Sequence, residues 1–397
     1  MRDLALAPAG ARRIAWAARW LPVLGAVRAR LERERPLAGV RLAACLPVTP
    51  ETAVLALALQ AGGADVLVCG GAAPALTQDD VAAALAADHG LAVHAVHDAA
   101  DDTRFAHLEA AADFRPQLVL DDGAELVSLL HAARREGLAH VLAATEAAPV
   151  GVLRLRALED EGKLALPVVA VGESAVGELL AGRHGAGQAA VDAIVRATGL
   201  LVAGSAWTVA GYGPAGRGVA ARARGLGAVV TVAEADPVRA LEAALDGFAV
   251  APLAEAVQGA AVVVTATGAR GALGALELEG VADGAVLANA GDEVGEIEGA
   301  ALRAAAQELR DAAPLVQEVV LRDGRSVLLL AGGRPVAAAA GGGQPALALD
   351  GLLAVQALAA EHALRHAATL ERRVYPVPAG IDREVARVKL ATMGFSA

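Results

Sequence analysis

Short apolar runs alternate with stretches of helical periodicity along much of the chain, and this alternation predicts the fold. Between residues 40 and 171, six apolar runs have the length of β-strands. We expect strands at 40–46, 64–69, 92–95, 117–120, 140–143 and 168–171. Strands that alternate with helices favour a parallel sheet with helices on both faces. Ahead of this block, apolar positions spaced among arginines predict a helix over residues 9–34.

A second alternating block runs from about residue 188 to residue 342. Its expected strands lie at 207–210, 229–233, 262–265, 286–289 and 327–330. Glycine-rich segments at 181–187 and 341–345 flank this block and are typical of hinges. Helical sequence follows at 347–366 and is expected to complete the first domain. We therefore predict an α/β protein with two doubly wound parallel-sheet domains, the second a Rossmann domain inserted into the first.

The most informative local pattern is a glycine-rich turn between the first strand and the first helix of the second block. Gly211 permits a tight turn, Gly213 lets the backbone approach a pyrophosphate, and Gly216 lets the helix pack closely on the strand. The start of that helix presents free N–H groups to phosphates. The next strand ends at Glu234, near the position where an acidic side chain accepts hydrogen bonds from ribose hydroxyls.

This pattern predicts a dinucleotide site that holds NAD. Glu234 would repel the extra phosphate of NADP, and the only nearby cation, Arg239, lies five residues further along the chain. The alternative is a glycine-rich turn in a domain that has lost its nucleotide, since the chain contains 44 glycines. The strand before the glycines and the helix after them favour the nucleotide site.

Composition and charge narrow the classes of partner. The chain is 56% hydrophobic but only 2% aromatic, so its core rests on alanine, valine and leucine. A net charge of −11 argues against nucleic acid or anionic membrane as the main partner, because both demand a basic surface. No uninterrupted apolar stretch reaches the roughly 20 residues of a membrane span, and no signal peptide is visible. Two cysteines suit a reducing compartment, and no histidine spacing indicates a metal, so we expect a cytoplasmic protein without a metal site.

Several segments, spread nearly end to end, resemble one enzyme family. They include Thr49-Pro50-Glu51-Thr52-Ala53-Val54-Leu55, Thr77-Gln78-Asp79-Asp80, Leu120-Asp121-Asp122-Gly123, Gly185-Ala186-Gly187-Gln188, Val209-Ala210-Gly211-Tyr212-Gly213, Thr265-Ala266-Thr267-Gly268, Leu287-Ala288-Asn289-Ala290-Gly291 and Tyr375-Pro376-Val377-Pro378. In this combination and order they are specific. The chain resembles the S-adenosyl-L-homocysteine hydrolase (adenosylhomocysteinase) family.

The resemblance implies an organisation and a chemistry. Residues 1–180 and 346–385 would form a substrate-binding domain, residues 188–342 an NAD-binding domain, and residues 386–397 a truncated C-terminal segment. The family is oligomeric, so we expect a homo-oligomer, either a dimer or a tetramer, whose ligand is a nucleoside or thionucleoside. In the family reaction NAD oxidises the 3′-hydroxyl, homocysteine leaves from C5′, water adds, and NADH restores the hydroxyl. The cofactor supplies the difficult chemistry, and the protein supplies acids, bases and positioning.

The same resemblance assigns site residues. Thr49, Glu51, Thr52 and Gln78 match substrate-contacting positions, although Thr49 to Thr52 also make a good helix start. Asp122 matches an active-site residue and stands at the carboxyl end of a predicted strand, where α/β sheets place ligands. We therefore take Asp122 as the catalytic candidate. Two further residues match positions near the cofactor, Thr267 and Asn289.

The departures from the family pattern fall on the chemistry. Where the family has a histidine, a glutamate, a lysine, an aspartate and an asparagine, this chain has Pro47, Ala147, Gly177, Ala181 and Ala337. The family's histidine after Asn-Ala-Gly is Asp292 here, and Glu146 stands one position before the lost glutamate. Family members also continue beyond the position of Ala397 into a tail that contacts the NAD of a neighbouring subunit. The substituted positions describe an emptied, more apolar pocket.

Three hypotheses remain open from the sequence. The chain is a divergent enzyme that keeps NAD and an adenosine-like ligand but performs another elimination or hydrolysis. Alternatively, it is the family hydrolase with relocated catalytic groups. Finally, it is a non-catalytic protein that binds NAD or adenosine-type ligands in a regulatory or partner role. General acid–base groups each contribute roughly 10²–10⁴-fold to a rate, so the loss of several bears directly on this choice.

Overall fold

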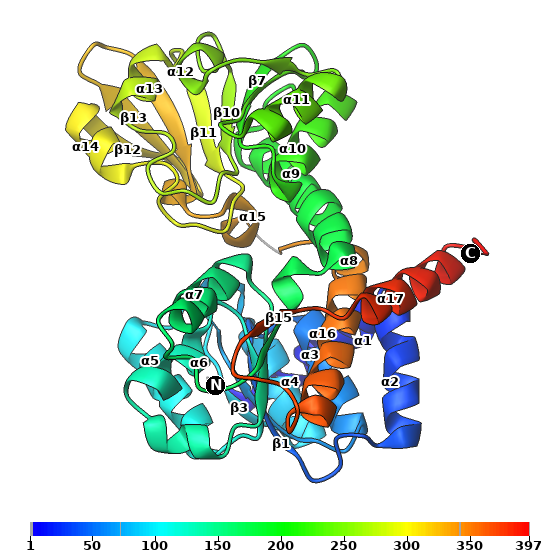
Figure 1. Cartoon of the computed structure of the whole chain (residues 1–397). Helices are drawn as coiled ribbons and strands as arrows, with labels where there is room; N and C mark the ends of the chain where they lie inside the picture. The colour runs from blue at the N-terminus through cyan, green and yellow to red at the C-terminus, as the bar shows by residue number, and fades with distance from the viewer. Residues whose placement is uncertain (1–2, 72, 341–342, 397) are drawn as a thin grey trace. The chain divides into compact units, whose positions relative to one another are not determined.

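The computed structural model describes residues 3–71, 73–340 and 343–396, and these form two compact units (Figure 1). The first unit is Met1–Leu180 together with Ala346–Ala397, and the second is Ala181–Pro345. The chain therefore leaves the first unit, builds the second and returns. Assignment of substrate to the first unit stays a prediction.

A seven-stranded parallel sheet forms the centre of the first unit, in the order β15-β6-β5-β4-β1-β2-β3. Its strands are β1 Arg41–Cys45, β2 Asp65–Cys69, β3 Ala92–His94, β4 Leu118–Asp121, β5 Ala143–Glu146, β6 Val168–Ala170 and β15 Val374–Pro376. From β1 the chain builds outward through β2 and β3, and from β4 it builds in the opposite direction. The strand order thus reverses between β1 and β4, and such a reversal opens a crevice at the carboxyl ends of the strands.

Both faces of this sheet are buried, because alternate residues of each strand enter different cores. In β1, Leu42 and Ala44 belong to one core, whereas Ala43 and Cys45 belong to the other. The helices of this unit are α1 Ala7–Ala18, α2 Pro22–Glu34, α3 Pro50–Ala61, α4 Asp79–His89, α5 Asp101–Asp113, α6 Glu125–Ala132, α7 Pro149–Asp160, α8 Ala175–Gly177, α16 Ala346–His366 and α17 Ala379–Thr392. Of the described helices, only α16 is long and apolar enough to cross a membrane, and it is mostly buried as a core helix against α2, α3 and α17.

The second unit holds an eight-stranded sheet in the order β12-β13-β14-β11-β10-β7-β8-β9. Its strands are β7 Ala206–Ala210, β8 Val229–Ala233, β9 Ala249–Val250, β10 Val262–Thr265, β11 Ala285–Asn289, β12 Ala306–Ala313, β13 Val316–Leu321 and β14 Ser326–Leu330. Its helices are α9 Ala186–Thr198, α10 Pro214–Gly225, α11 Pro237–Leu245, α12 Leu253–Ala256, α13 Ala275–Gly280, α14 Gly299–Ala305 and α15 Val336–Ala339. The order reverses between β7 and β10. The predicted fold class, two doubly wound α/β domains with the second inserted, is confirmed.

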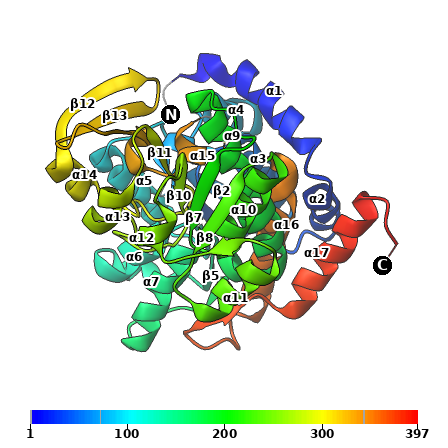
Figure 2. The ribbon, with the colours of Figure 1, turned by 90° about the horizontal axis from the view of Figure 1, so that it is seen from above.

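The antiparallel hairpin of β12 and β13 at one edge of the second sheet is absent from the sequence prediction (Figure 2). Seven of the eight residues of β12 are exposed, so the strand lacks the alternation that marks a buried strand. The strand expected at 140–143 is wrong by three positions, because β5 spans Ala143–Glu146. The single helix expected over 9–34 is two helices, α1 and α2, and Pro22 opens the second.

The glycine-rich segments at the ends of the second block have different outcomes. Residues 181–187, which the sequence predicts as a hinge, are helical. A π-helix, Glu178–Gly185, leads directly into α9. Gly187 of α9 packs against Gly218 of α10 so closely that a Cβ atom at position 187 would lie 2.3 Å from the Gly218 carbonyl carbon. In the second hinge segment, Gly341 and Gly342 lie outside the described residues.

Candidate functional site

The glycine turn lies at the strand reversal of the second sheet, between β7 and α10. Gly211 has φ of +97°, a conformation that residues with a side chain rarely adopt. A Cβ atom at this position would lie 2.4 Å from the carbonyl oxygen of Ala266, which follows the neighbouring strand β10. The tight turn predicted for Gly211 is therefore present. Glycine is required there because the ends of β7 and β10 lie too close together for a side chain.

The other two glycines serve opposite purposes. A Cβ atom at Gly216 would lie 1.9 Å from the Gly211 carbonyl oxygen, so glycine is what lets α10 begin directly against the turn. At Gly213, by contrast, the nearest atom to such a Cβ is a guanidinium nitrogen of Arg239 at 3.7 Å. Gly213 therefore faces open space at the start of α10, where a pyrophosphate approaches the backbone in this type of turn.

Glu234 stands one residue after β8, as the sequence predicts, and its carboxylate is held against the same turn. It accepts hydrogen bonds from the backbone N–H of Tyr212 at 2.6 Å and of Asp236 at 2.9 Å. These contacts orient the carboxylate beside Gly213, and each oxygen keeps lone pairs for ribose hydroxyls. The turn, the helix start and the acidic side chain together fit an NAD-type dinucleotide.

Tyr212 fixes the turn from its buried side, a role that the glycine fingerprint does not contain. Its hydroxyl donates to Asp246 at 2.7 Å, and its backbone oxygen accepts from the Arg217 side chain at 3.0 Å. Burial raises the pKa of Tyr212 above its usual range, and the hydrogen bond to Asp246 adds to this effect. The residue between the glycines therefore anchors the loop to the core, and its aromatic character was the available signal.

The two residues expected near the cofactor lie at the ends of β10 and β11, but protein groups engage them. Thr267 gives both its backbone N–H and its hydroxyl to the buried carboxylate of Glu296. The Asn289 amide donates to the backbone oxygens of Glu293 and Gly333 and accepts from the N–H of Gly291. These side chains shape the loops around the strand ends. Glu296, which organises one of them, carried no sequence motif.

In the first unit, Thr49 and Thr52 form the helix start that was the alternative reading of this segment. Thr49 caps α3, accepting from the Thr52 N–H at 3.3 Å, while the Thr52 hydroxyl donates to the Pro47 oxygen at 2.6 Å. Glu51 lies in the first turn of α3 and is half-buried, without a hydrogen bond or ion pair among the described residues. Gln78 precedes α4, and its side-chain oxygen is buried without a hydrogen-bond partner in the described structure.

Asp122 follows β4 at the strand reversal of the first sheet and is half-buried. Its N–H donates to Asp121, whose fully buried carboxylate also accepts from the N–H groups of Glu125 and Val127. Burial raises the pKa of Asp121 to about 6, against these hydrogen bonds. Asp121 therefore caps α6, and Asp122 follows it at the carboxyl end of β4.

Glu146 lies at the end of the adjacent strand β5, and its carboxylate contacts backbone N–H groups of the neighbouring loops. Its carboxylate accepts from the N–H groups of Gly123, Ala124 and Ala148 at 2.7–2.8 Å. Burial and the neighbouring Asp121 raise the pKa of Glu146 to about 8. A Cβ atom at Gly151 would lie 2.3 Å from this carboxyl group, so the chain makes room for it. Glu146 thus holds two loops together.

Gly177, one of the positions at which the sequence predicts a departure from the family, lies close to a neighbouring side chain. Gly177 is buried in α8, and a Cβ atom there would lie 2.9 Å from a methyl carbon of Leu352 in α16. Pro47 is buried, and Ala147 is half-buried after β5. Leu352 therefore takes up the space into which a longer side chain at 177 would extend.

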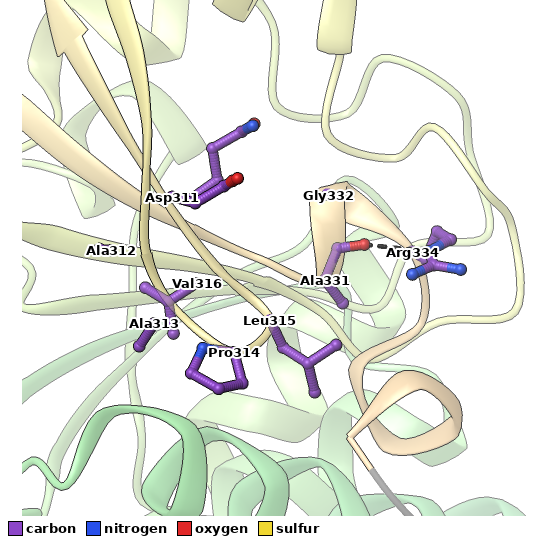
Figure 3. Close-up of a pocket in the computed structure, with 10 residues that line it drawn as sticks. Asp311, Ala312, Ala313, Pro314, Leu315, Val316, Ala331, Gly332 and Arg334 are labelled. Carbon is purple, nitrogen blue, oxygen red and sulfur yellow. Dashed lines mark hydrogen bonds between the residues drawn. The ribbon is translucent and has the colours of Figure 1, made fainter.

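Two other kinds of candidate site are a cluster of metal-ligating side chains and a hollow on the surface of the second unit. Within residues 3–71, 73–340 and 343–396, no group of three or more His, Cys, Asp or Glu side chains is placed to share a metal ion. A cavity of about 580 Å³ lies at the β12–β13 turn and is lined by Leu315 and Arg334 among others (Figure 3). Its ten lining residues include none of the predicted site residues.

Comparison with known proteins agrees with the sequence resemblance. Residues 1–149 match the model of S-adenosyl-L-homocysteine hydrolase, and residues 183–343 match that of its NAD-binding domain. The chain is 41% identical over 396 residues to adenosylhomocysteinase of Thermosynechococcus vestitus, covering 100% of this chain and 92% of that protein. It is 44% identical to adenosylhomocysteinase of Pyrococcus abyssi, covering 100% of this chain and 93% of that protein. It is also 44% identical to adenosylhomocysteinase of Aquifex aeolicus, covering 99% of this chain and 94% of that protein. The chain therefore belongs to the adenosylhomocysteinase family, with NAD as the cofactor of its second unit.

Proposed function

We propose that this protein holds NAD and acts on an S-adenosylhomocysteine-type thionucleoside, the family reaction being hydrolysis of S-adenosylhomocysteine to adenosine and homocysteine. The observation that carries the proposal is the intact glycine turn with Glu234, in a chain about 41–44% identical to named adenosylhomocysteinases over its whole length. Packing requires glycine at 211 and 216, but it does not require glycine at 213, where the missing side chain leaves room for a nucleotide. The protein is expected to purify with NAD(H).

The residues of the second unit have separate tasks in this proposal. NAD, when bound, supplies the oxidation of the nucleoside 3′-hydroxyl and its later reduction. Gly213 admits the pyrophosphate to the backbone, and the N–H groups at the start of α10 donate to it. The Glu234 carboxylate accepts from the ribose hydroxyls. Thr267 and Asn289 hold the two loops that flank the turn.

In the first unit, we assign three side chains to the nucleoside. Glu51 accepts a hydrogen bond, and the unpartnered oxygen of Gln78 accepts another, because a buried acceptor without a donor is costly unless a ligand satisfies it. An adenine amino group or ribose hydroxyls supply such donors. Asp122, at the strand reversal, is the candidate acid or base.

The test is a coupled thiol assay for homocysteine released from S-adenosylhomocysteine, together with the NAD(H) content of the purified protein. Nucleotide bound in near-stoichiometric amount and homocysteine release above the no-enzyme control support the proposal. An Asp122→Asn variant should reduce turnover by roughly 10²-fold or more while it retains NAD, as expected for a general acid or base. Protein that contains no NAD and gains none on incubation contradicts the proposal.

A second candidate function is binding of the nucleoside without family turnover, and the packing at Gly177 favours it. Leu352 fills the space beside this glycine, and the Glu146 carboxylate is fully engaged by three N–H groups. Neither position offers a free group for acid–base chemistry. Adenosine that stabilises the protein in thermal unfolding, without any product in chromatography of the reaction mixture, would favour this candidate. Nucleoside products without homocysteine would instead indicate an altered elimination or hydrolysis.

The assembly and location of the protein also belong to the proposal. We expect a homo-oligomer, a dimer or a tetramer, in the cytoplasm, with neither nucleic acid nor membrane as a partner. The exposed apolar side chains of α11, Val238, Leu241 and Leu245, support self-association, and the net charge of −11 opposes binding to anionic polymers. Light scattering coupled to size-exclusion chromatography measures the subunit count, and a monomer would contradict this part.

A further inference from the structure

One arginine lies over the open face of the glycine turn. Arg239 belongs to the first turn of α11, and one of its guanidinium nitrogens is 3.7 Å from the position that a Cβ atom of Gly213 would occupy. The side chain is exposed. It therefore extends from α11 to the place where the backbone faces open space at the start of α10.

The Arg239 side chain has no protein partner in the described residues: no hydrogen bond or ion pair of its guanidinium is present. Arg217, on the same side of the turn, contrasts with it, because Arg217 pairs with Glu242 and donates to the Tyr212 oxygen. Glu234 is also engaged, by the N–H groups of Tyr212 and Asp236. The turn thus carries one uncommitted positive charge, and a guanidinium pairs well with phosphate oxygens.

We propose that Arg239 is a cofactor-binding residue that contacts a phosphate group of the dinucleotide at the Gly213 turn. This rests on the NAD site described above and adds to it, because the glycine fingerprint requires no cation. Glycine at 213 leaves no side chain between the guanidinium and a pyrophosphate against the backbone. The acidic Glu234 and the basic Arg239 then share the adenosine half of the cofactor, one contacting ribose hydroxyls and the other phosphate.

Two phosphate groups of a dinucleotide have the chemistry that a guanidinium binds. The pyrophosphate is common to NAD and NADP, whereas the 2′-phosphate is present only in NADP. Arg239 also offsets part of the repulsion that Glu234 exerts on a 2′-phosphate. The preference for NAD over NADP is therefore weaker than Glu234 alone would impose.

The test measures the binding of NAD, NADP, ADP-ribose and adenosine by calorimetry, with nucleotide-depleted wild type and Arg239→Gln. We expect about tenfold weaker binding of NAD and ADP-ribose in the variant, with adenosine unchanged, since a hydrogen bond to a charged group has about this value. Raising the salt concentration should weaken NAD binding in wild type more than in the variant, because screening acts on the charge pair. Arg239→Lys, which keeps the charge, should recover part of the affinity.

Arg222→Gln is the matched control, because Arg222 is exposed in the last turn of the same α10 that begins at the glycine turn. A loss shared by NAD, NADP and ADP-ribose assigns the guanidinium to the pyrophosphate, and a loss confined to NADP assigns it to the 2′-phosphate. Either result supports the phosphate contact. Affinities and salt dependence in Arg239→Gln that equal those of Arg222→Gln overturn it. If the wild-type protein binds no dinucleotide at all, the NAD site itself is contradicted. This outcome differs from failure of the Arg239 proposal, in which the wild type and both variants bind NAD equally well.

Discussion

The two units present different kinds of chemistry at the carboxyl ends of their sheets. In the second unit, the glycine turn presents mainly backbone groups. A Cβ atom at Gly211 or Gly216 would lie 2.4 or 1.9 Å from a backbone oxygen, and the absence of a side chain at Gly213 leaves the start of α10 open. In the first unit the strand-end carboxylates of Asp121 and Glu146 are tied to backbone N–H groups. The second unit therefore presents backbone groups at its strand ends, whereas the first presents carboxylates that backbone N–H groups already occupy.

The difference follows from what each kind of site requires. At Gly211 and Gly216 the backbone cradle depends on the fold of the turn, so a side chain at either position strains the structure, whereas Gly213 has no close contact. A side-chain site is separable from the fold, because an acid or base can be lost while packing closes the space. Leu352 beside Gly177 shows this closure. Part of the second unit's site, Gly211 and Gly216, is therefore required by packing as well as by ligand binding.

The largest expected effect comes from filling the contact between the turn and α10. Gly216→Val places side-chain atoms where a Cβ already lies 1.9 Å from the Gly211 oxygen, so α10 must move away from the turn. We expect a loss of at least about 3 kcal/mol of stability and of bound NAD(H), measured by denaturant unfolding and nucleotide content. Gly225→Ala, at the open end of the same helix, is the control and should be neutral or slightly stabilising. A stable Gly216→Val protein with full NAD would break the comparison.

The second largest effect concerns Glu146. Glu146→Ala leaves three N–H groups, two of them buried, without an acceptor, and we expect a loss of about 3 kcal/mol in the free energy of unfolding. The exposed Glu161→Ala should change it by less than about 0.5 kcal/mol. NAD content should stay unchanged in both variants. Loss of NAD in Glu146→Ala at temperatures where it remains folded would show that the two sites are not separable.

The pKa of Glu146 adds a pH dependence to this prediction. Because the folded pKa is about 8 and the ordinary value is 4.5, the folded state binds the proton more tightly than the unfolded state. The contribution of this group to stability is therefore fully present below about pH 4.5 and is lost as the pH rises to about 8. Unfolding measured across this range should show a steeper decline in wild type than in Glu146→Ala. Equal slopes would contradict the raised pKa.

The sequence predicted most of the architecture and the positions of the glycine turn and Glu234, for reasons visible in particular residues. The glycine turn and Glu234 have fixed spacing on adjacent strands, so periodicity and motif suffice to place them. The roles of Glu146 and Glu296 were missed because each acts through backbone N–H groups supplied by distant loops, which no local pattern marks. The hairpin β12–β13 was missed because an exposed edge strand lacks apolar alternation.

A smaller effect separates the two interpretations of Thr49. Thr49→Val removes the cap of α3, and we expect a loss of about 1 kcal/mol in the free energy of unfolding. Thr49→Ser keeps the capping oxygen and should restore that stability. If adenosine binding is also restored in the serine variant, the hydroxyl suffices for both roles. If Thr49→Val is as stable as wild type, the capping assignment is wrong.

The smallest expected effect on stability, and the sharpest test of the first unit, belongs to Glu51. Its half-buried carboxylate has no partner among the described residues, in contrast to Asp121 and Glu146, so Glu51→Gln should change the free energy of unfolding by less than about 0.5 kcal/mol. If the group serves the nucleoside, the same variant should bind adenosine about tenfold more weakly, because a charged acceptor becomes a neutral amide. Calorimetry with adenosine measures this, and NAD affinity serves as the internal control. Unchanged adenosine affinity would show that the Glu51 carboxylate does not contact the nucleoside. The departures that the sequence predicts at acid–base positions would then include a nucleoside-binding position as well.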